Sequence, residues 1–435
     1  MKKIVIIIMA VAMTETIFAQ STGIGIKLDN LDRTNVPGND FYKFACDGWR
    51  KANPLKAEYA RFGSFDAVAE KNREQLQTLI TELAQNKQEK GSVAQKIGDL
   101  YNMVMDSARQ NKDGIKPVLK DLKQIEKTKK RQDLISLFIK NDAVGKGFIF
   151  GAGIGADMMN STQNLVSIGQ GGLSLGDKDY YLKDDDATKK IRDGFKTHII
   201  KMFKLVGDND KTATRKMESV MAIETKIAEK SKSRVELRDP ETNYHKMSYA
   251  DLKKDYENFP WDEYWTTNFI TDLDFVDVGQ PEAILNDIEI LNTVPVRQLQ
   301  DWMAWKVLDN SATELGDEVY AEHFDFFGRQ MSGKQQMQPR WKRAVNACNG
   351  VLGEAVGEMY VQKYFPAENK ARMKELVKNL QIALGERIDQ QDWMSAETKK
   401  LAKENGIELT EQEAEYYKIL NITGTGIMGY IQIPK

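Results

Sequence analysis

Apolar residues recur three and four positions apart along most of this chain, which is the spacing of one face of an α-helix. The pattern is clear in residues 93–104 and 115–125, resumes near residue 187 and covers most of residues 281–391. Stripes of this kind are expected to pack into a core rather than to line a binding groove. The chain is therefore predicted to be mainly α.

One segment, residues 147–182, departs from the helical spacing. Residues 148–150 and 165–168 are apolar and flank a polar stretch at residues 160–164. Two short apolar runs separated in this way are typical of a hairpin with a longer loop. The fold class predicted from the sequence is therefore a multi-helix lobe with a small antiparallel β element.

Three other segments interrupt the helical pattern. Residues 20–64 contain the pairs Pro37-Gly38 and Asn53-Pro54 and are predicted to be rich in loops. A second loop is expected around Asp239-Pro240, and an aromatic-rich stretch at residues 259–265 follows it. No tandem repeat and no low-complexity tract is found.

The composition is that of a soluble globular protein. Charged residues make up 29% and hydrophobic residues 41% of the 435 positions. At about 150 residues per domain, this length allows two or three domains. The 62 Lys and Arg residues nearly cancel the 64 Asp and Glu residues, so no long-range field attracts nucleic acid or an anionic membrane. A nucleic-acid partner is therefore not expected.

The first residues have the pattern of an export signal. Lys2 and Lys3 precede an apolar run at residues 4–13, which is too short to span a bilayer. Ala19 followed by Gln20 is a plausible cleavage point. Residues 1–19 are therefore predicted to be a signal peptide that sends the chain to the periplasm or outside the cell, with a buried N-terminal helix as the alternative. No later segment is apolar enough to be a transmembrane segment.

The two cysteines of the exported chain are Cys46 and Cys348. They could pair in an oxidising compartment. They are too few to form a structural zinc site, which takes four ligands.

A zinc peptidase places two His residues four positions apart on one helix face, with a Glu beside the first. The chain has three His residues, His198, His245 and His323, and no two of them have this spacing. His198 lies on the apolar stripe that begins at Ile191, so it is expected to be packed in the core. A site assembled from all three His residues remains an alternative, because catalytic zinc uses three protein ligands.

Three glycine motifs suggest other chemistries. Residues 172–176 match the G-x-S-x-G pattern around Ser174, but a charged loop follows where a nucleophile elbow needs a helix. Residues 151–156 and 424–429 match a dinucleotide-binding fingerprint, but neither is followed by a helix that could receive a pyrophosphate. These glycines are interpreted as strand and loop residues, and a serine hydrolase is kept as an alternative function.

A series of short blocks, each modest alone, is specific in its order and spacing. Taken together, the blocks resemble the neprilysin and endothelin-converting-enzyme family of zinc metalloendopeptidases. The resemblance runs from about residue 30 to about residue 402, and residues 20–402 are taken as the neprilysin-type region, with 403–435 as an unmatched tail. The blocks are residues 37–42, 46–49, 53–54, 61–66, 171–173, 179–182 and 238–240, Tyr244, Trp302, Trp305, and residues 339–343, 355–357, 360–361, 393–394 and 398.

The resemblance implies a fold of two mostly helical lobes around a closed cavity that admits short peptides. This stretch of sequence would supply most of the noncatalytic lobe, and the zinc ligands and general base of H-E-x-x-H would lie further along. No such motif occurs in the 435 residues. The expected function is therefore that of the N-terminal, cavity-capping part of an exported zinc endopeptidase. It has no catalytic residue, metal ligand or cofactor of its own, is inactive alone, and has a zinc lobe as its partner.

An alternative function is a noncatalytic module that binds peptides or docks to a partner. For either function, the resemblance implies one substrate-binding residue, Arg61. In the family the matching Arg can bind the C-terminal carboxylate of a substrate, because a guanidinium meets two carboxylate oxygens at once. A structural arginine is the alternative interpretation of Arg61.

Overall fold

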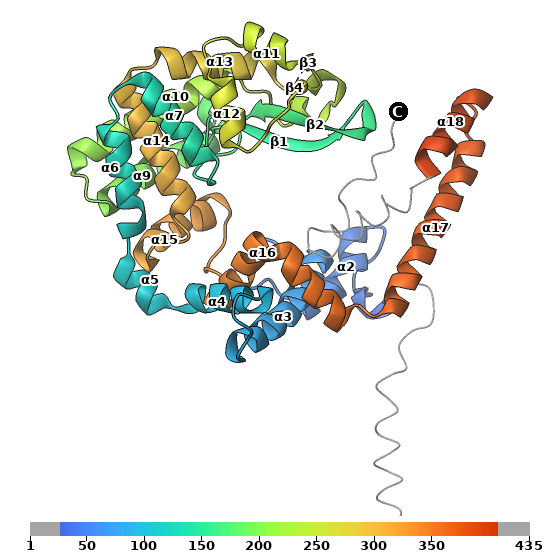
Figure 1. Ribbon diagram of the computed structural model, residues 1–435. Coiled ribbons are helices and arrows are strands. Elements are labelled where there is room, and N and C mark those ends of the chain that lie inside the picture. The colour runs from blue at the N-terminus through green and yellow to red at the C-terminus, as the bar shows by residue number, and fades with distance from the viewer. Residues whose placement is uncertain (1–26, 408–435) are drawn as a thin grey trace, which may run out of the picture. The chain divides into compact units, whose positions relative to one another are not determined.

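The computed structural model describes residues 27–407 and consists of helices and one small sheet (Figure 1). The predicted signal peptide, the glycine motif at 424–429 and residues 408–435 of the tail lie outside the described residues. The elements are η1 (Leu28–Asn30), α2 (Phe41–Ala52), α3 (Ser64–Gln85), α4 (Val93–Met105), α5 (Ser107–Asp113), α6 (Lys116–Lys127), α7 (Arg131–Asp142), β1 (Phe150–Asp157), β2 (Asn160–Gln170), α8 (Asp179–Leu182), α9 (Asp186–Leu205), α10 (Asp210–Lys230), η2 (Glu236–Arg238), η3 (Glu241–Asn243), β3 (Lys246–Ser248), α11 (Tyr249–Asp255), α12 (Trp261–Thr267), β4 (Phe275–Val278), α13 (Pro281–Thr293), α14 (Val296–Ser311), α15 (Asp317–His323), the π-helix η4 (Phe324–Met331), α16 (Arg340–Tyr364), α17 (Ala367–Asp389) and α18 (Ala396–Ile407).

The chain divides into two compact units, and the boundary falls within α3, between Val68 and Ala69. The first unit contains α2, so the prediction that residues 20–64 are mostly loop is wrong for residues 41–52. The carboxylate of Asp40 accepts a hydrogen bond from the Lys43 N–H at 2.9 Å and caps the helix N-terminus. Asn53 ends the helix, because a residue before proline is disfavoured in the α conformation. The pairs Pro37-Gly38 and Asn53-Pro54 therefore bracket a helix.

The main core of the second unit is built around α14. All residues from Leu299 to Leu308 are buried, so this part of the helix is covered on every face. It packs against α6, α7, α9 and α10, and Figure 1 shows it in orange among these helices. Trp302 and Trp305 contribute the largest side chains on α14, and neither is exposed. The predicted mainly α fold is confirmed.

A second, smaller cluster joins α3, α4 and α16. Its buried members include Ile80, Ile97 and Val345. The helices approach closely where α4 has a glycine: a Cβ on Gly98 would lie 3.0 Å from the backbone of Ala84. The apolar stripe predicted for residues 93–104 is thus a packing face, as expected.

The four strands form one mixed sheet in the order β1-β2-β4-β3. β1 and β2 make the predicted antiparallel hairpin, whereas β4 pairs with β2 in parallel and β3 pairs with β4 antiparallel. The predicted longer loop is wrong: the polar residues 160–164 belong to β2, and Met158 and Met159 make the turn. Polar side chains fit here because the described ones point into solvent. β3 and β4 are too short to show a period-two pattern and were not predicted.

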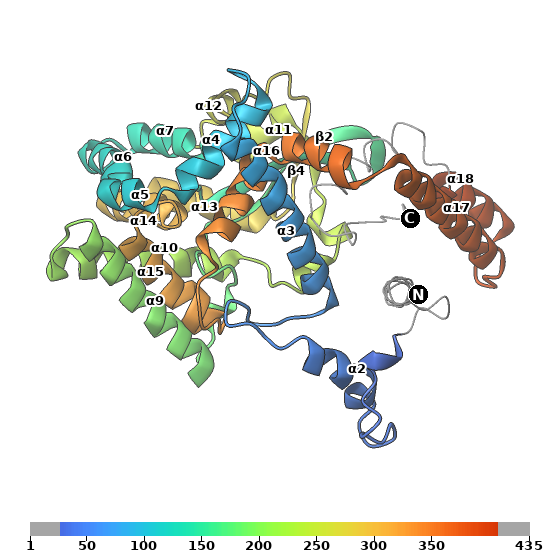
Figure 2. The same ribbon diagram turned by 90° about the horizontal axis from the view of Figure 1, so that it is seen from below.

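The last two described helices, α17 and α18, pack against each other as a helical pair (Figure 2). Met373, Leu376, Val377 and Leu380 lie three and four positions apart on α17, yet all four are exposed. We call these four residues the α17 stripe. The spacing predicts a buried helix face, but in the described residues this face is open.

Candidate peptide-binding site

Arg61, the one predicted substrate-binding residue, lies in the first unit, in the loop that connects α2 to α3. Its side chain is exposed. Among residues 27–407, its guanidinium makes no hydrogen bond or ion pair. Arg61 is therefore open to an anionic group from another molecule.

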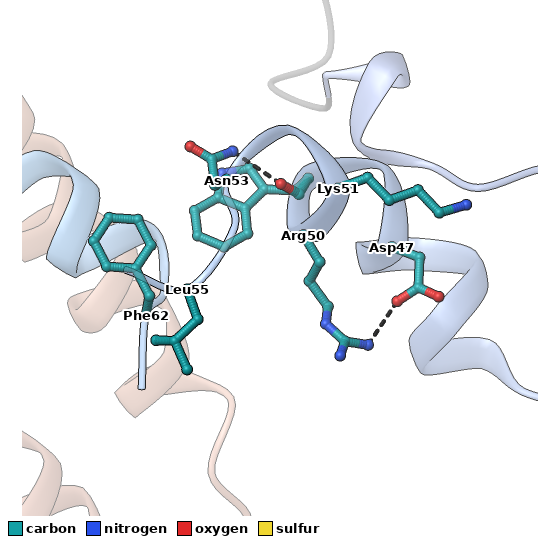
Figure 3. Close-up of a pocket in the computed structure, with 7 residues that line it drawn as sticks. Asp47, Arg50, Lys51, Asn53, Leu55 and Phe62 are labelled. Carbon is teal, nitrogen blue, oxygen red and sulfur yellow. Dashed lines mark hydrogen bonds and ion pairs between the residues drawn. The ribbon is translucent and has the colours of Figure 1, made fainter. Parts of the chain in front are cut away.

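A pocket of about 430 Å³ is lined by residues that are close to Arg61 in the sequence (Figure 3). Arg61 itself is not one of its lining residues, but the next residue, Phe62, is. The ring of Phe62 stacks on Trp49 of α2 with the ring centroids 6.1 Å apart, and Tyr59 meets it edge-on at 5.1 Å. These aromatic contacts hold the loop against α2. The lining residues are Asp47, Trp49, Arg50, Lys51, Asn53, Leu55 and Phe62.

The cations of the pocket already have carboxylate partners within the first unit. Arg50 Nη1 donates to Asp47 Oδ1 at 2.7 Å, as Figure 3 shows. Lys51 Nζ donates to Asp32 Oδ2 at 2.6 Å. Hydrogen bonds from Lys51 and then Thr34 hold the pKa of Asp32 at about 2, so this carboxylate stays ionised. Arg61 differs from both cations, because its charge is not matched by a carboxylate in the described residues.

His198 lies on α9 inside the main core and is packed there, as predicted. Its Nδ1 is 3.2 Å from Glu322 Oε1, and burial lowers its pKa. His323 on α15 is its neighbour, with ring centroids 6.0 Å apart, and burial lowers the pKa of His323 to about 4. Both imidazoles are therefore neutral at pH 7.

His245 belongs to a different element. It directly precedes β3, and its backbone N–H donates to Asp277 Oδ1 at 2.6 Å. Within residues 27–407, no three or more His, Cys, Asp or Glu side chains are grouped so that they could hold a metal ion. The described residues thus do not fit the three-ligand site of a catalytic zinc.

Ser174 is a half-buried member of a hydrogen-bond network centred on Glu224 rather than an exposed nucleophile. Its hydroxyl donates to Glu224 Oε1 at 2.7 Å and accepts a hydrogen bond from Trp305 Nε1 at 2.9 Å. Glu224 also accepts hydrogen bonds from the Ser174 N–H, from Tyr181 Oη and from Trp302 Nε1. The Ser174 hydroxyl therefore contacts a carboxylate and an indole, and no imidazole is in position to act as its base. This arrangement does not support a serine hydrolase.

The glycine motif at residues 151–156 forms most of strand β1, as interpreted from the sequence. It does not precede a helix N-terminus, because the chain turns back into β2. The motif therefore has none of the geometry that binds a dinucleotide.

The two cysteines are free thiols in this structure. Cys46 lies on α2 and is partly exposed, whereas Cys348 lies on α16 in the second cluster. Its Sγ is 3.7 Å from the Ile97 carbonyl oxygen, and burial raises its pKa to about 11. Cys348 is therefore a packed, unreactive side chain.

Sequence comparison identifies the family. Residues 37–406 match the N-terminal model of peptidase family M13, which is most of the chain. The chain belongs to peptidase family M13.

The M13 chain is 27% identical over 392 residues to human endothelin-converting enzyme 1, an alignment that covers 87% of this chain and 50% of the relative. It is 26% identical over 416 residues to human neprilysin, covering 88% of this chain and 55% of that protein. The chain thus spans about half the length of these relatives. The family resemblance inferred from the short sequence blocks is confirmed.

Solved structures agree with the M13 assignment. The crystal structure of zinc metalloprotease Zmp1 from Mycobacterium tuberculosis, in complex with an inhibitor, matches with a TM-score of 0.82 and 28% identity, over 89% of this chain and 58% of that chain. PepO from Lactobacillus rhamnosis matches with a TM-score of 0.71 over 88% of this chain and 58% of that chain; at 19% identity it supports the fold alone.

Several family blocks have structural roles in this M13 chain. The block at residues 339–343 starts α16, where Arg340 donates to Asp317 Oδ1 at 2.6 Å and Lys342 makes a buried ion pair with Glu70 of α3. Ser174 directly follows the block at residues 171–173, and Tyr181 belongs to the block at residues 179–182; both donate hydrogen bonds to the carboxylate of Glu224. Sequence reasoning did not find Glu224, although a Glu inside the apolar stripe of α10 was a usable signal.

None of the helices within residues 27–407 is long and apolar enough to cross a membrane.

Proposed function

We propose that this chain is the N-terminal, cavity-capping part of an exported M13 zinc metalloendopeptidase that acts on short peptides. The observation that carries the proposal is the family match over residues 37–406, together with the similarity to proteins named zinc metalloprotease, endothelin-converting enzyme and neprilysin. Zinc and the general base would be supplied by a separate lobe. This chain supplies walls of the cavity and contacts to the peptide.

Export is part of the proposal and is supported by the sequence of the first residues. Lys2 and Lys3 followed by the apolar run at residues 4–13 are typical of a signal peptide. In the periplasm or outside the cell, the enzyme would meet the short peptides that such a cavity admits.

Arg61 is proposed to bind the C-terminal carboxylate of the peptide. Its guanidinium is exposed and has no partner among the described residues, while Arg50 and Lys51 are held by Asp47 and Asp32. A carboxylate that accepts two parallel N–H bonds from a guanidinium gains both energy and orientation. The stacked rings of Trp49 and Phe62 fix the backbone next to Arg61.

The proposal predicts that the purified chain binds no stoichiometric zinc and cleaves no peptide. The 435 residues contain no H-E-x-x-H motif, and three His residues on separate elements do not replace it. Metal analysis of the purified chain and a fluorogenic peptide library measure both properties. One zinc ion per chain, with cleavage that a chelator abolishes, would contradict the proposal that a separate lobe supplies the zinc site.

The role of Arg61 is tested in a completed enzyme. This chain is joined to the zinc lobe of an M13 relative, and Arg61→Ala is compared with the parent on free-acid peptides and on the same peptides as C-terminal amides. The preference for the free acid should fall by about 1.5–3 kcal/mol, the usual value of a charge-assisted hydrogen bond.

The matched control is Arg33→Ala, which removes another exposed arginine of the first unit. It should leave the preference unchanged. An equal loss of activity by Arg61→Ala on acids and amides would show that Arg61 has a structural role.

A further inference from the structure

We propose that the open edge of β1 binds an extended peptide segment as an additional strand of the sheet. β1 is a terminal strand in the order β1-β2-β4-β3, so within residues 27–407 only one of its two edges is paired. Binding at this edge goes beyond the proposed function, because it requires neither a zinc lobe nor Arg61.

The direction of the backbone groups follows from the hydrogen bonds of β2. The carbonyl of Ile168 accepts from the Gly279 N–H at 2.9 Å, and the N–H of Gln170 donates to Gln280 Oε1 at 2.8 Å. Both groups therefore point toward the β4 side of the sheet. Because backbone groups alternate in direction along a strand, Gly169 must point its N–H and C=O toward β1.

The pairing register between β1 and β2 shows which residues of β1 point toward β2 and which point away from it. Gly169 is opposite Gly151, and Ile168 is opposite Ala152. In an antiparallel pair, hydrogen-bonded and non-hydrogen-bonded positions alternate, so Gly151 bonds to β2 and Ala152 does not. Ala152, and by the same alternation Ile154, therefore direct their N–H and C=O groups to the open edge.

This edge is accessible. Residues 151–156 are all exposed, and within residues 27–407 no backbone hydrogen bond outside the sheet uses the N–H of Ala152, Ile154 or Ala156. Sheet edges are usually protected by charged residues or proline, and β1 has neither between residues 150 and 156. On one face of β1 the alternate residues are glycines: a Cβ on Gly153 or Gly155 would meet nothing within 4 Å. No side chain of β1 on that face would block an incoming strand.

The chemistry of the edge indicates the kind of partner. The open groups are backbone donors and acceptors, which pair with any extended chain. The exposed side chain of Ile154 (63%) favours an apolar residue beside it, and residues 150–156 carry no charge. A neutral peptide with alternating apolar residues therefore fits.

A second copy of this chain fits less well than a peptide. The exposed edge is six residues long, and the pairing register shifts between Ala156 and Asp157 at its end. Pairing two such short edges buries much less than the roughly 1,200 Å² of a stable protein interface. A peptide needs only this one edge.

The test uses the full chain and a fluorescent peptide of sequence Lys-Thr-Val-Thr-Val-Thr-Val-Glu, which has no net charge once it is acetylated at its N-terminus and amidated at its C-terminus. The amide removes the carboxylate that Arg61 would bind, so Arg61→Ala should bind this probe as the parent does. Fluorescence anisotropy should show saturable binding to the parent. Loss of binding in Arg61→Ala would overturn the assignment to β1.

The deciding variants are Ala152→Pro and its control Ala152→Val. Proline removes the outward N–H and leaves the bonds to β2, which edge positions tolerate. Ala152→Pro should weaken binding about tenfold or more, because it removes a hydrogen bond and places a ring at the edge. Ala152→Val keeps the N–H and should bind as the parent does. If Ala152→Pro does not fold, Ile154→Lys replaces it, since a lysine at a sheet edge also opposes pairing.

A probe that is N-methylated at alternate residues lacks the N–H groups that face β1 and should not bind. The proposal is overturned if the methylated probe or Ala152→Pro binds as well as the parent pair. It is also overturned if the parent does not bind the probe but forms a dimer that Ala152→Pro abolishes, because the edge then serves a second copy.

Discussion

Asp309, near the C-terminal end of α14, carries a carboxyl oxygen whose burial has consequences for stability. Its Oδ1 is buried and has no hydrogen-bond partner in the described residues. His323 Nε2 lies 3.7 Å away, and the charges of Lys306 and Glu224 also act on this carboxyl. Burial raises its pKa from 3.8 to about 7. Between pH 3.8 and about 7, the native protein therefore keeps a proton on Asp309 that the unfolded chain releases.

The substitution Asp309→Asn is expected to stabilise the protein in a pH-dependent way. Between pH 3.8 and about 7, the native state binds more protons than the unfolded state, so Asp309 lowers stability progressively as the pH rises. Asparagine removes this effect. Its advantage over the parent should be near zero at pH 4 and reach about 4 kcal/mol above pH 7.

Thermal or denaturant unfolding of both proteins at pH 4 and pH 8 measures the difference. His323 acts in the opposite direction, because its low native pKa weakens the protein as the pH falls from 6.5 to about 4, but it is present in both proteins. A stability difference that is the same at both pH values would contradict the protonation of Asp309.

At the scale of secondary-structure elements, the carboxylate of Glu224 on α10 ties three parts of the chain together. It accepts from Ser174 and Tyr181, 50 and 43 positions before it, and from Trp302, 78 positions after it. The network connects the segment after β2, helix α8 and helix α14 to α10. Each donor in it is buried or nearly so and depends on this one acceptor.

The substitution Glu224→Ala is expected to destabilise the protein by several kcal/mol. It leaves the Ser174 N–H, the Tyr181 hydroxyl and the Trp302 indole N–H without their acceptor, and each buried unsatisfied donor costs about 1–3 kcal/mol. The control is Glu229→Ala, an exposed position on the same helix, which should change stability little. Unfolding curves of both variants are compared, and equal small effects would show that the donors find other partners.

Some helices of this chain can be predicted from local apolar spacing, and others cannot. The stripe at residues 93–104 predicted α4, because a helix packed on one side repeats its apolar residues at helical spacing. The sequence pattern does not predict helix α2, because the flanking pairs Pro37-Gly38 and Asn53-Pro54 are typical of loops.

Contacts between distant segments were harder to predict. β4 has four residues and joins the sheet through β2, about 110 positions earlier, so local spacing does not show it. Glu224 lies within an apolar stripe, and its role depends on donors that sequence order separates widely. For the candidate site, the family resemblance identified Arg61, but no local pattern indicated the aromatic contact of Trp49 with Phe62.

At the scale of the whole molecule, several large apolar side chains are exposed to solvent. The α17 stripe is 41–54% exposed, and Phe41 and Tyr42 of the first unit are also exposed. At about 25 cal/mol per Å², even a few hundred Å² of such surface corresponds to several kcal/mol. This is the size of a domain's whole stability.

The chain is therefore expected to self-associate as its concentration rises. Leu376→Glu combined with Leu380→Glu should reduce the association, because charges on the α17 stripe oppose its burial. The control, Lys374→Gln combined with Lys378→Gln, changes the net charge by the same amount at exposed positions of α17 outside the stripe and should behave as the parent does. Analytical ultracentrifugation over a range of concentrations measures the association. A monodisperse parent that unfolds cooperatively would favour the self-sufficient binding module instead.

The burial of α14 on all its faces sets the time scale on which the second unit can open. An amide hydrogen in residues 299–308 of this helix meets solvent only when α6, α7, α9 and α10 separate from it together, which is global unfolding. The α17–α18 pair has exposed faces and can open locally without that event. Deuterium uptake will therefore divide this chain into regions with very different lifetimes, and the Trp302 and Trp305 positions will be among the last to exchange.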